Sequence, residues 1–156
     1  MALRKGRIQE EDASQLKLGP EFEMAGCFSI SEVKLLLEQQ DKPADTAVYK
    51  KTHEYVNQFA RFSSTDAAQA ARQILSKDTT LKPFELAQLA SLCPEEAEEA
   101  KSLIPSLDTK DDDALQALLN ELSDLQQFIL TKLIRPVLRS ALYRIVFVKH
   151  VQSRTM

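Results

Sequence analysis

The chain has 156 residues and a formal net charge of −3, and 44% of its residues are hydrophobic and 6% aromatic. This length is enough for one domain with a hydrophobic core. The absence of Trp, the three Gly and the many Ala, Leu, Glu, Gln and Lys residues favour helices over strands.

The charge is uneven: residues 129–156 contain six basic and no acidic side chains, which leaves a net charge of −9 for residues 1–128. A body this acidic is poorly suited to hold nucleic-acid phosphates, so we expect an all-α, protein-binding module.

Residues 1–28 show no sustained helical period and are predicted to form an extended arm. Within the arm, residues 10–22 alternate weakly, which would place Leu16 and Leu18 on one face of a short strand. A lone strand is not stable in water, so the arm is expected to lie on another molecule; the alternative is a disordered N-terminus. Residues 2–15 lack the apolar core of a signal peptide, which predicts a cytoplasmic or nuclear protein.

Two helices are predicted next. Ser29 and Glu32 fit a capping box that begins a helix ending near Gln40, and Thr46 is the candidate cap of a second helix. The second helix repeats apolar or β-branched residues at spacings of three or four, namely Val48, Thr52, Tyr55, Phe59 and Phe62. We expect this face to be core, because buried aromatic residues dominate cores; the alternative is a binding surface.

Prolines and acidic residues delimit the remaining helices. A small-residue helix is predicted over residues 67–76, and Pro83 is expected at the first position of the next helix. Pro94 breaks that helix and begins another, which Pro105 ends. Residues 111–113 supply a cap and negative charge to a last helix with one leucine face, formed by Leu115, Leu118, Leu119, Leu122 and Leu125. About six helices with short connectors predict a compact bundle over residues 29–128.

No catalytic or metal-binding set can be assembled from the sequence. Cys27 and Cys93 form no CxxC pair and His53 and His150 lie near neither, while the phosphate-loop and HExxH motifs are missing. The acidic cluster over residues 95–99 is typical of a solvated helix N-terminus rather than of metal ligands. We therefore predict no enzymatic activity, no metal and no cofactor.

Residues 129–156 form an atypical basic and apolar tail. Lys132, Arg135, Arg139 and Pro136 interrupt it too often for a membrane span, so no membrane partner is expected. The last helix is predicted to continue for a turn or two before Pro136 kinks or ends it. The tail is either a surface helix that binds acidic lipid, nucleic acid or the acidic body, or non-coding sequence translated beyond the true end.

Three blocks of sequence resemble the fourth-largest subunit of eukaryotic RNA polymerase II. They are EEDASQLKLGP in the arm, YVNQFARF, and KPFELAQLASLCPEEAEEAKSLIPSL, and the resemblance covers about residues 10–128. It implies a helical domain of the kind found at the C-termini of helicases and RNase D, and an arm that lies on the seventh polymerase subunit. It also implies a nuclear, non-catalytic stalk heterodimer on the polymerase core, which supports transcription initiation and meets emerging RNA through the partner.

The resemblance also implies partner-binding positions, which are Ala13, Leu16, Leu18 and Phe22 in the arm and, more weakly, Phe84, Leu103, Ile104 and Pro105 in the body. The weaker candidates could instead be core residues. Two alternatives stay open, an equivalent stalk subunit of another nuclear polymerase and a free helical nucleic-acid-binding module of helicase type. The connector over residues 41–45 is shorter than in some yeast relatives, and family members usually stop near residues 125–128.

Overall fold

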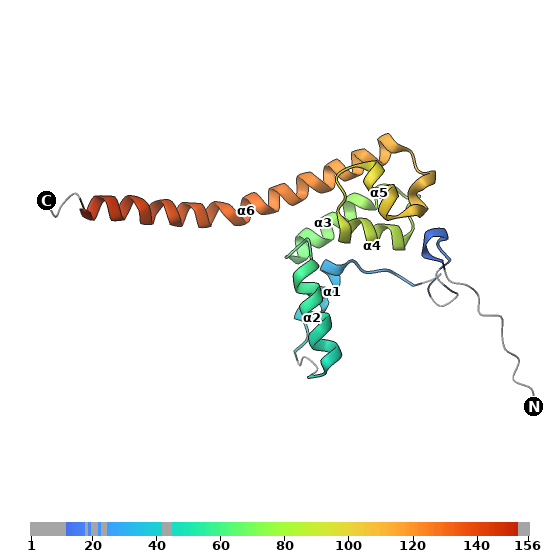
Figure 1. Ribbon diagram of the computed structural model, residues 1–156, viewed down its shortest axis with the longest axis horizontal. Helices are drawn as coiled ribbons and strands as arrows, with labels where there is room; N and C mark the ends of the chain where they lie inside the picture. Colours follow the sequence, from blue (N-terminus) through green and yellow to red (C-terminus); the bar gives the residue numbers. More distant parts are fainter. Residues whose placement is uncertain (1–11, 18, 20–21, 23–24, 42–44, 153–156) are drawn as a thin grey trace, which may run out of the picture.

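The computed structural model describes residues 12–17, 19, 22, 25–41 and 45–152, with side chains described as far as residue 132. Within this part of the chain all regular structure is helical, which confirms the predicted all-α bundle (Figure 1). The α-helices are α1 (Ile30–Glu38), α2 (Ala47–Phe59), α3 (Thr65–Leu75), α4 (Pro83–Leu92), α5 (Ala97–Leu103) and α6 (Asp112–Gln152), and the short 3-10 helices are η1 (Ala13–Gln15) and η2 (Pro105–Thr109).

Three predicted helix starts are confirmed by their caps. The Ser29 hydroxyl accepts a hydrogen bond from the Glu32 amide, and the Glu32 carboxylate accepts one from the Ser29 amide at 2.7 Å, which completes the capping box of α1. Thr46 caps α2 by accepting from the amide of Tyr49 at 3.1 Å. Asp111 caps α6 by accepting from the amide of Ala114 at 3.0 Å. These side chains satisfy amides that have no partner within their own helix.

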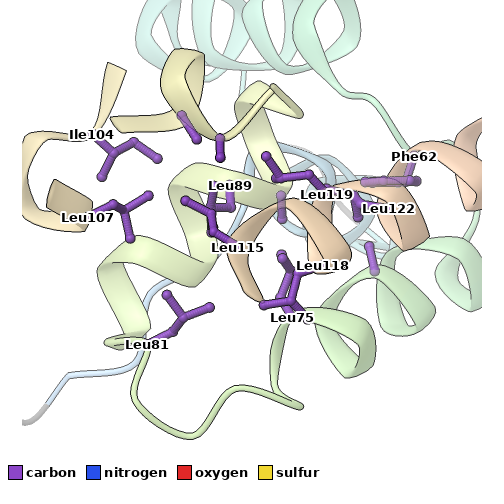
Figure 2. Packing of buried hydrophobic residues seen from close by; sticks show 14 of the residues in the cluster. Phe62, Leu75, Leu81, Leu89, Ile104, Leu107, Leu115, Leu118, Leu119 and Leu122 are labelled. Carbon is purple, nitrogen blue, oxygen red and sulfur yellow. The ribbon is translucent and has the colours of Figure 1, made fainter. Parts of the chain in front are cut away.

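The core lies where α3, α4, α5 and η2 surround the first half of α6 (Figure 2). The large residues at its centre are at most 1% exposed, and they are Phe62, Leu75, Leu89, Leu107, Leu119 and Leu122. Three buried alanines of α3, over residues 67–71, let this helix approach its neighbours closely. The predicted leucine face of α6 is confirmed, with Leu115 and Leu118 also buried and Leu125 packed at the edge.

The predicted aromatic core face of α2 is wrong. Val48 is 75% exposed, Tyr55 53% and Phe59 45%. Phe62 is buried, but it lies beyond the end of α2. The residue through which α2 enters the interior is Val56, at 3% exposure. Because α2 packs mainly against α1, and not into the centre of the bundle, only a narrow strip of its surface is covered.

The start of α5 also differs from the prediction, which placed Pro94 at the first helical position. Cys93 ends α4 in a left-handed conformation with φ 49°, and α5 begins only at Ala97. The left-handed residue turns the chain away from the axis of α4, so the buried Pro94 belongs to the connection. The amide of Ala97 then donates at 2.8 Å to the side chain of Gln116 on α6, which serves as a distant cap.

The sequence predicted that Pro136 kinks or ends the last helix; an end at Pro136 is wrong, because α6 continues as one helix to Gln152. A proline removes a single amide donor, and the helix-forming residues on both sides sustain the remaining hydrogen bonds. Figure 1 shows the C-terminal part of α6 extending away from the bundle. Side chains beyond residue 132 lie outside the description, so the tail's binding properties stay predictions. No helix in the described part of the chain has both the length and the apolarity of a membrane span.

Candidate partner-binding surface

The first part of the arm is a closed turn, not the predicted strand. Asp12 and Lys17 exchange two backbone hydrogen bonds, each 2.9 Å long, and η1 lies between them. The Asp12 carboxylate accepts from the amide and the hydroxyl of Ser14 at 3.0 and 2.6 Å, and these bonds lower the pKa of Asp12. Leu16 takes a left-handed conformation with φ 57°, which breaks the alternation of a strand. Leu18, its predicted neighbour on the same face, lies outside the described residues.

The turn packs against η2 and forms the first of two apolar grooves. This groove has a volume of about 130 Å³, and its lining residues come from η1, α4 and the end of α5: Ala13, Ser14, Phe84, Gln88, Leu103, Ile104 and Pro105. Five of these residues were among the predicted partner-binding positions. Ser14 of the arm and Phe84 of the body, which are 70 positions apart in the sequence, therefore contribute to one surface.

A second groove of about 210 Å³ adjoins the first, since Phe84 lines both. Its remaining lining residues are Leu16, Phe22, Ala25, Cys27, Lys82 and Pro83. Seven of the eight predicted positions thus come together around Phe84. The sequence reasoning missed Ser14, Gln88, Ala25, Cys27 and the pair Lys82-Pro83, although the pair could have been found from its adjacency to Phe84.

The seven positions are not equally available to a partner. Phe22 is 56% exposed and Leu103 is 51% exposed, so both present apolar surface to solvent. Ile104 is only 3% exposed and belongs to the hydrophobic core. For Ile104, the alternative left open by the sequence, that the weaker candidates are core residues, is therefore correct. Ile104 supports the floor of the first groove, whereas Leu103 and Pro105 form its accessible wall.

Glu85, next to Phe84, fixes the shape of both grooves. It is 1% exposed, and its two carboxylate oxygens accept hydrogen bonds from the amide of Lys82 and the hydroxyl of Ser106, each at 2.8 Å. A buried carboxylate is tolerated only when its oxygens are satisfied in this way. The N-terminus of α4 and the start of η2 are therefore held together by one side chain. The sequence signal that could have found it is a Glu three residues after Lys82, at the capping-box position.

Arg72 on α3 anchors the base of the arm. Its guanidinium donates to the carbonyl of Cys27 at 2.7 Å and forms a two-point ion pair with Glu32, one bond of which is 2.7 Å long. Burial of Glu32 raises its pKa, but the hydrogen bonds from Arg72 and Ser29 outweigh burial and hold this pKa below its ordinary value. The arm thus enters α1 from a fixed point.

An acidic hollow borders the first groove at Pro105. It is open, has a volume of about 650 Å³, and is lined by Glu98, Asp108 and Asp112, with Lys101 as the single cation. Lys101 pairs with Asp112 at 2.5 Å and donates to a backbone carbonyl at 2.6 Å. The rim of the apolar surface on this side is consequently negative.

The described residues contain no group of His, Cys, Asp and Glu side chains arranged to hold a metal ion. Burial raises the pKa of the Cys93 thiol to about 11, against a smaller opposing effect of Arg61, so this thiol stays protonated at neutral pH. The arrangement of the grooves is suited to bury apolar side chains of another protein.

Comparison with known proteins identifies the family of the chain. The model of a family described as RNA polymerase Rpb4 matches residues 7–126. DNA-directed RNA polymerase II subunit rpb4 of Schizosaccharomyces pombe is 48% identical over 131 residues, which cover 78% of this chain and 96% of the relative. DNA-directed RNA polymerase II subunit 4 of Arabidopsis thaliana is 40% identical over 134 residues, covering 77% and 96%. The match to RPB4 of Saccharomyces cerevisiae is 43% identical over 98 residues but covers 43% of that protein. The chain belongs to the RNA polymerase Rpb4 family.

Proposed function

We propose that this chain is a non-catalytic subunit of DNA-directed RNA polymerase II that forms the stalk heterodimer with the seventh subunit. The relatives named as fourth subunits of that enzyme support the polymerase assignment. The single observation that supports the partner is the convergence of arm and body on two grooves that share Phe84. As a polymerase II subunit, the protein works in the nucleus.

Binding at the grooves is driven by burial of apolar surface. The exposed side chains of Phe22 and Leu103 stand on either side of Phe84 and offer anchors for apolar residues of the seventh subunit. The acidic hollow beside Pro105 favours a partner surface with a basic edge. In this arrangement the chain supports its partner on the polymerase core during initiation, and emerging RNA is met through the partner.

Two other functions fit less well. An equivalent subunit of another nuclear polymerase would use the same surface, but the relatives at 48% and 40% identity are named as polymerase II subunits. A free nucleic-acid-binding module would need basic surface, whereas residues 1–128 carry a net charge of −9.

The test is the affinity of the full chain for the purified seventh subunit, measured by isothermal titration calorimetry. Leu103→Glu places a charge in the first groove and should weaken binding about tenfold or more. Leu130→Glu is the matched control, because Leu130 is 55% exposed, close to the 51% of Leu103, but lies on α6 outside both grooves. Failure of the unmodified chain to bind the seventh subunit, or equal losses in the two variants, would contradict the proposal.

A further inference from the structure

One side of α2 exposes a row of side chains that the fold leaves uncovered. They follow one another at spacings of four, three and four residues and so form a single stripe along the helix, made of Val48, Thr52, Tyr55 and Phe59. All four are exposed, and the rings of Tyr55 and Phe59 lie against each other with their centroids 4.7 Å apart. Contiguous, mainly apolar surface of this kind on a folded protein marks an interaction site.

The stripe is open because α2 is covered on another side. The main contacts of α2 are with α1, where the Tyr49 hydroxyl donates to the carbonyl of Leu37 at 3.5 Å. Val56, the buried residue of α2, lies on this covered side. Figure 1 shows α1 and α2 extending together away from the rest of the bundle. A helix covered on one side only can bury its second apolar face against another molecule.

The spacing of the stripe is symmetrical, so the stripe is complementary to a second copy of itself. The steps of four, three and four residues are the same from either end of the helix. When two copies of α2 run antiparallel, Val48 of each copy lies opposite Phe59 of the other, and Thr52 lies opposite Tyr55. Each layer of the contact then combines a small side chain with an aromatic one. Steps of three and four residues are also the pattern with which helices pack side by side.

The charges beside the stripe are self-complementary as well. Lys51 and Glu54 are both exposed and lie one helical turn apart on the open side of α2. Neither has an ion-pair partner among the described residues. One cation and one anion match neither a strongly acidic nor a strongly basic surface. In the antiparallel pair the open sides of the two copies meet, and Lys51 of each copy lies near Glu54 of the other.

We propose that the stripe Val48–Thr52–Tyr55–Phe59 is the contact surface of a symmetric, antiparallel dimer of this chain. The dimer is independent of the proposed function, because no residue of α2 lines either groove. Each copy contributes one side of a single helix, which is less than the roughly 1,200–2,000 Å² of total surface buried in stable complexes. The dimer is therefore weak, and its population should rise between about 10 µM and 1 mM protein.

The first experiment is analytical ultracentrifugation of the full chain over this concentration range. Tyr55→Glu should lower the association constant about tenfold or more, because it places a charge in the middle of the contact. Leu130→Glu is the matched control and should change it less than about twofold, since Leu130 is 55% exposed, close to the 53% of Tyr55, but lies on α6. In the unmodified chain, the amides of residues 47–59 should exchange hydrogen more slowly at high than at low protein concentration. This measurement does not depend on how a variant folds.

The second experiment exchanges the charges. Lys51→Glu and Glu54→Lys each place like charges at both charged contacts, so each alone should lower the association constant about fivefold or more. The double exchange restores opposite charges and should restore association. An equimolar mixture of the two single variants should associate more tightly than either variant alone, because every charged contact between them is attractive.

Several results would overturn the inference. One is a chain that stays monomeric at about 1 mM, and another is a double exchange that fails to restore association. If Leu130→Glu disrupts association while Tyr55→Glu does not, the copies meet through α6 and not through the stripe. If Tyr55→Glu weakens binding of the seventh subunit at concentrations where the chain is monomeric, the stripe belongs to that partner. Failure of the seventh subunit to bind the unmodified chain contradicts only the proposed function and leaves the dimer standing.

Discussion

Arg72 on α3 and Glu32 on α1 form a two-point ion pair in which both ends of the carboxylate are held by the guanidinium. The same guanidinium reaches the carbonyl of Cys27, the last part of the arm before Ser29 caps α1. One side chain therefore joins the arm, α1 and α3. Both α1 and α3 also pack against α4, whose Phe84 lines both grooves.

Arg72→Met should lower the free energy of unfolding by about 1–3 kcal/mol, the usual effect of removing hydrogen bonds to a charged group. The loss arises because the partly buried Glu32 carboxylate and the Cys27 carbonyl both lose a donor. Urea unfolding followed by circular dichroism measures the change. Lys50→Met is the control, since its pair with Asp45 is exposed and should contribute little. If both substitutions lowered the free energy of unfolding equally, the Arg72–Glu32 pair would contribute no more to stability than an exposed ion pair.

The stability of the protein should fall in acid partly through Glu32. The folded state holds the pKa of Glu32 below its ordinary value of 4.5, so the unfolded chain takes up the proton first as the pH drops. The stabilisation is complete above about pH 4.5 and is lost as the pH falls through the lowered pKa. The difference in free energy of unfolding between the native chain and Glu32→Gln should therefore shrink between pH 6 and pH 3. A difference that stays constant over this range would contradict the assignment.

Two phenylalanines three residues apart should differ sharply in their effect on stability. Phe62→Ala should cost about 3–5 kcal/mol, because Phe62 is 1% exposed and its removal leaves a cavity in the core. Phe59→Ala should cost about 1 kcal/mol or less, since Phe59 is 45% exposed and its main loss is the contact with Tyr55. Chemical unfolding of the two variants under one set of conditions tests this, and comparable losses would argue that Phe59 is a core residue.

The thiol of Cys93 should be almost inert in the folded protein. Its pKa is raised from 9.0 to about 11 by burial, so at pH 8 the reactive thiolate is roughly a hundredfold scarcer than in the unfolded chain. Cys27→Ser leaves Cys93 as the single cysteine. Alkylation of this variant by iodoacetamide at pH 8 should be about a hundredfold faster in concentrated urea than in buffer. Similar rates in the two solvents would mean that Cys93 is accessible.

Much of the helical framework could be predicted because local chemistry determines it. Ser29 and Glu32 satisfy each other's amides within four residues, and Pro94 and Pro105 lie just beyond the ends of α4 and α5. Ala13 and Leu103 were each expected at a partner interface from the family resemblance, but their meeting in one groove was not predicted, since no local pattern links an arm to residues far along the chain. The side of α2 that faces α1 could not be predicted, because periodicity defines a face without defining what covers it. The turn at Leu16 was missed for a related reason: a weak alternation does not reveal a left-handed residue.

The buried carboxylate of Glu85 has a kinetic consequence. The Glu85 carboxylate accepts hydrogen bonds from the amide of Lys82 and from the hydroxyl of Ser106. The two walls of the groove beside Phe84 are therefore held in the bound arrangement before a partner binds. The helical bundle then needs little rearrangement at this groove when a partner docks. Complex formation at the groove should accordingly proceed in a single diffusional step, with an observed rate that rises in direct proportion to the concentration of the seventh subunit and reaches no plateau.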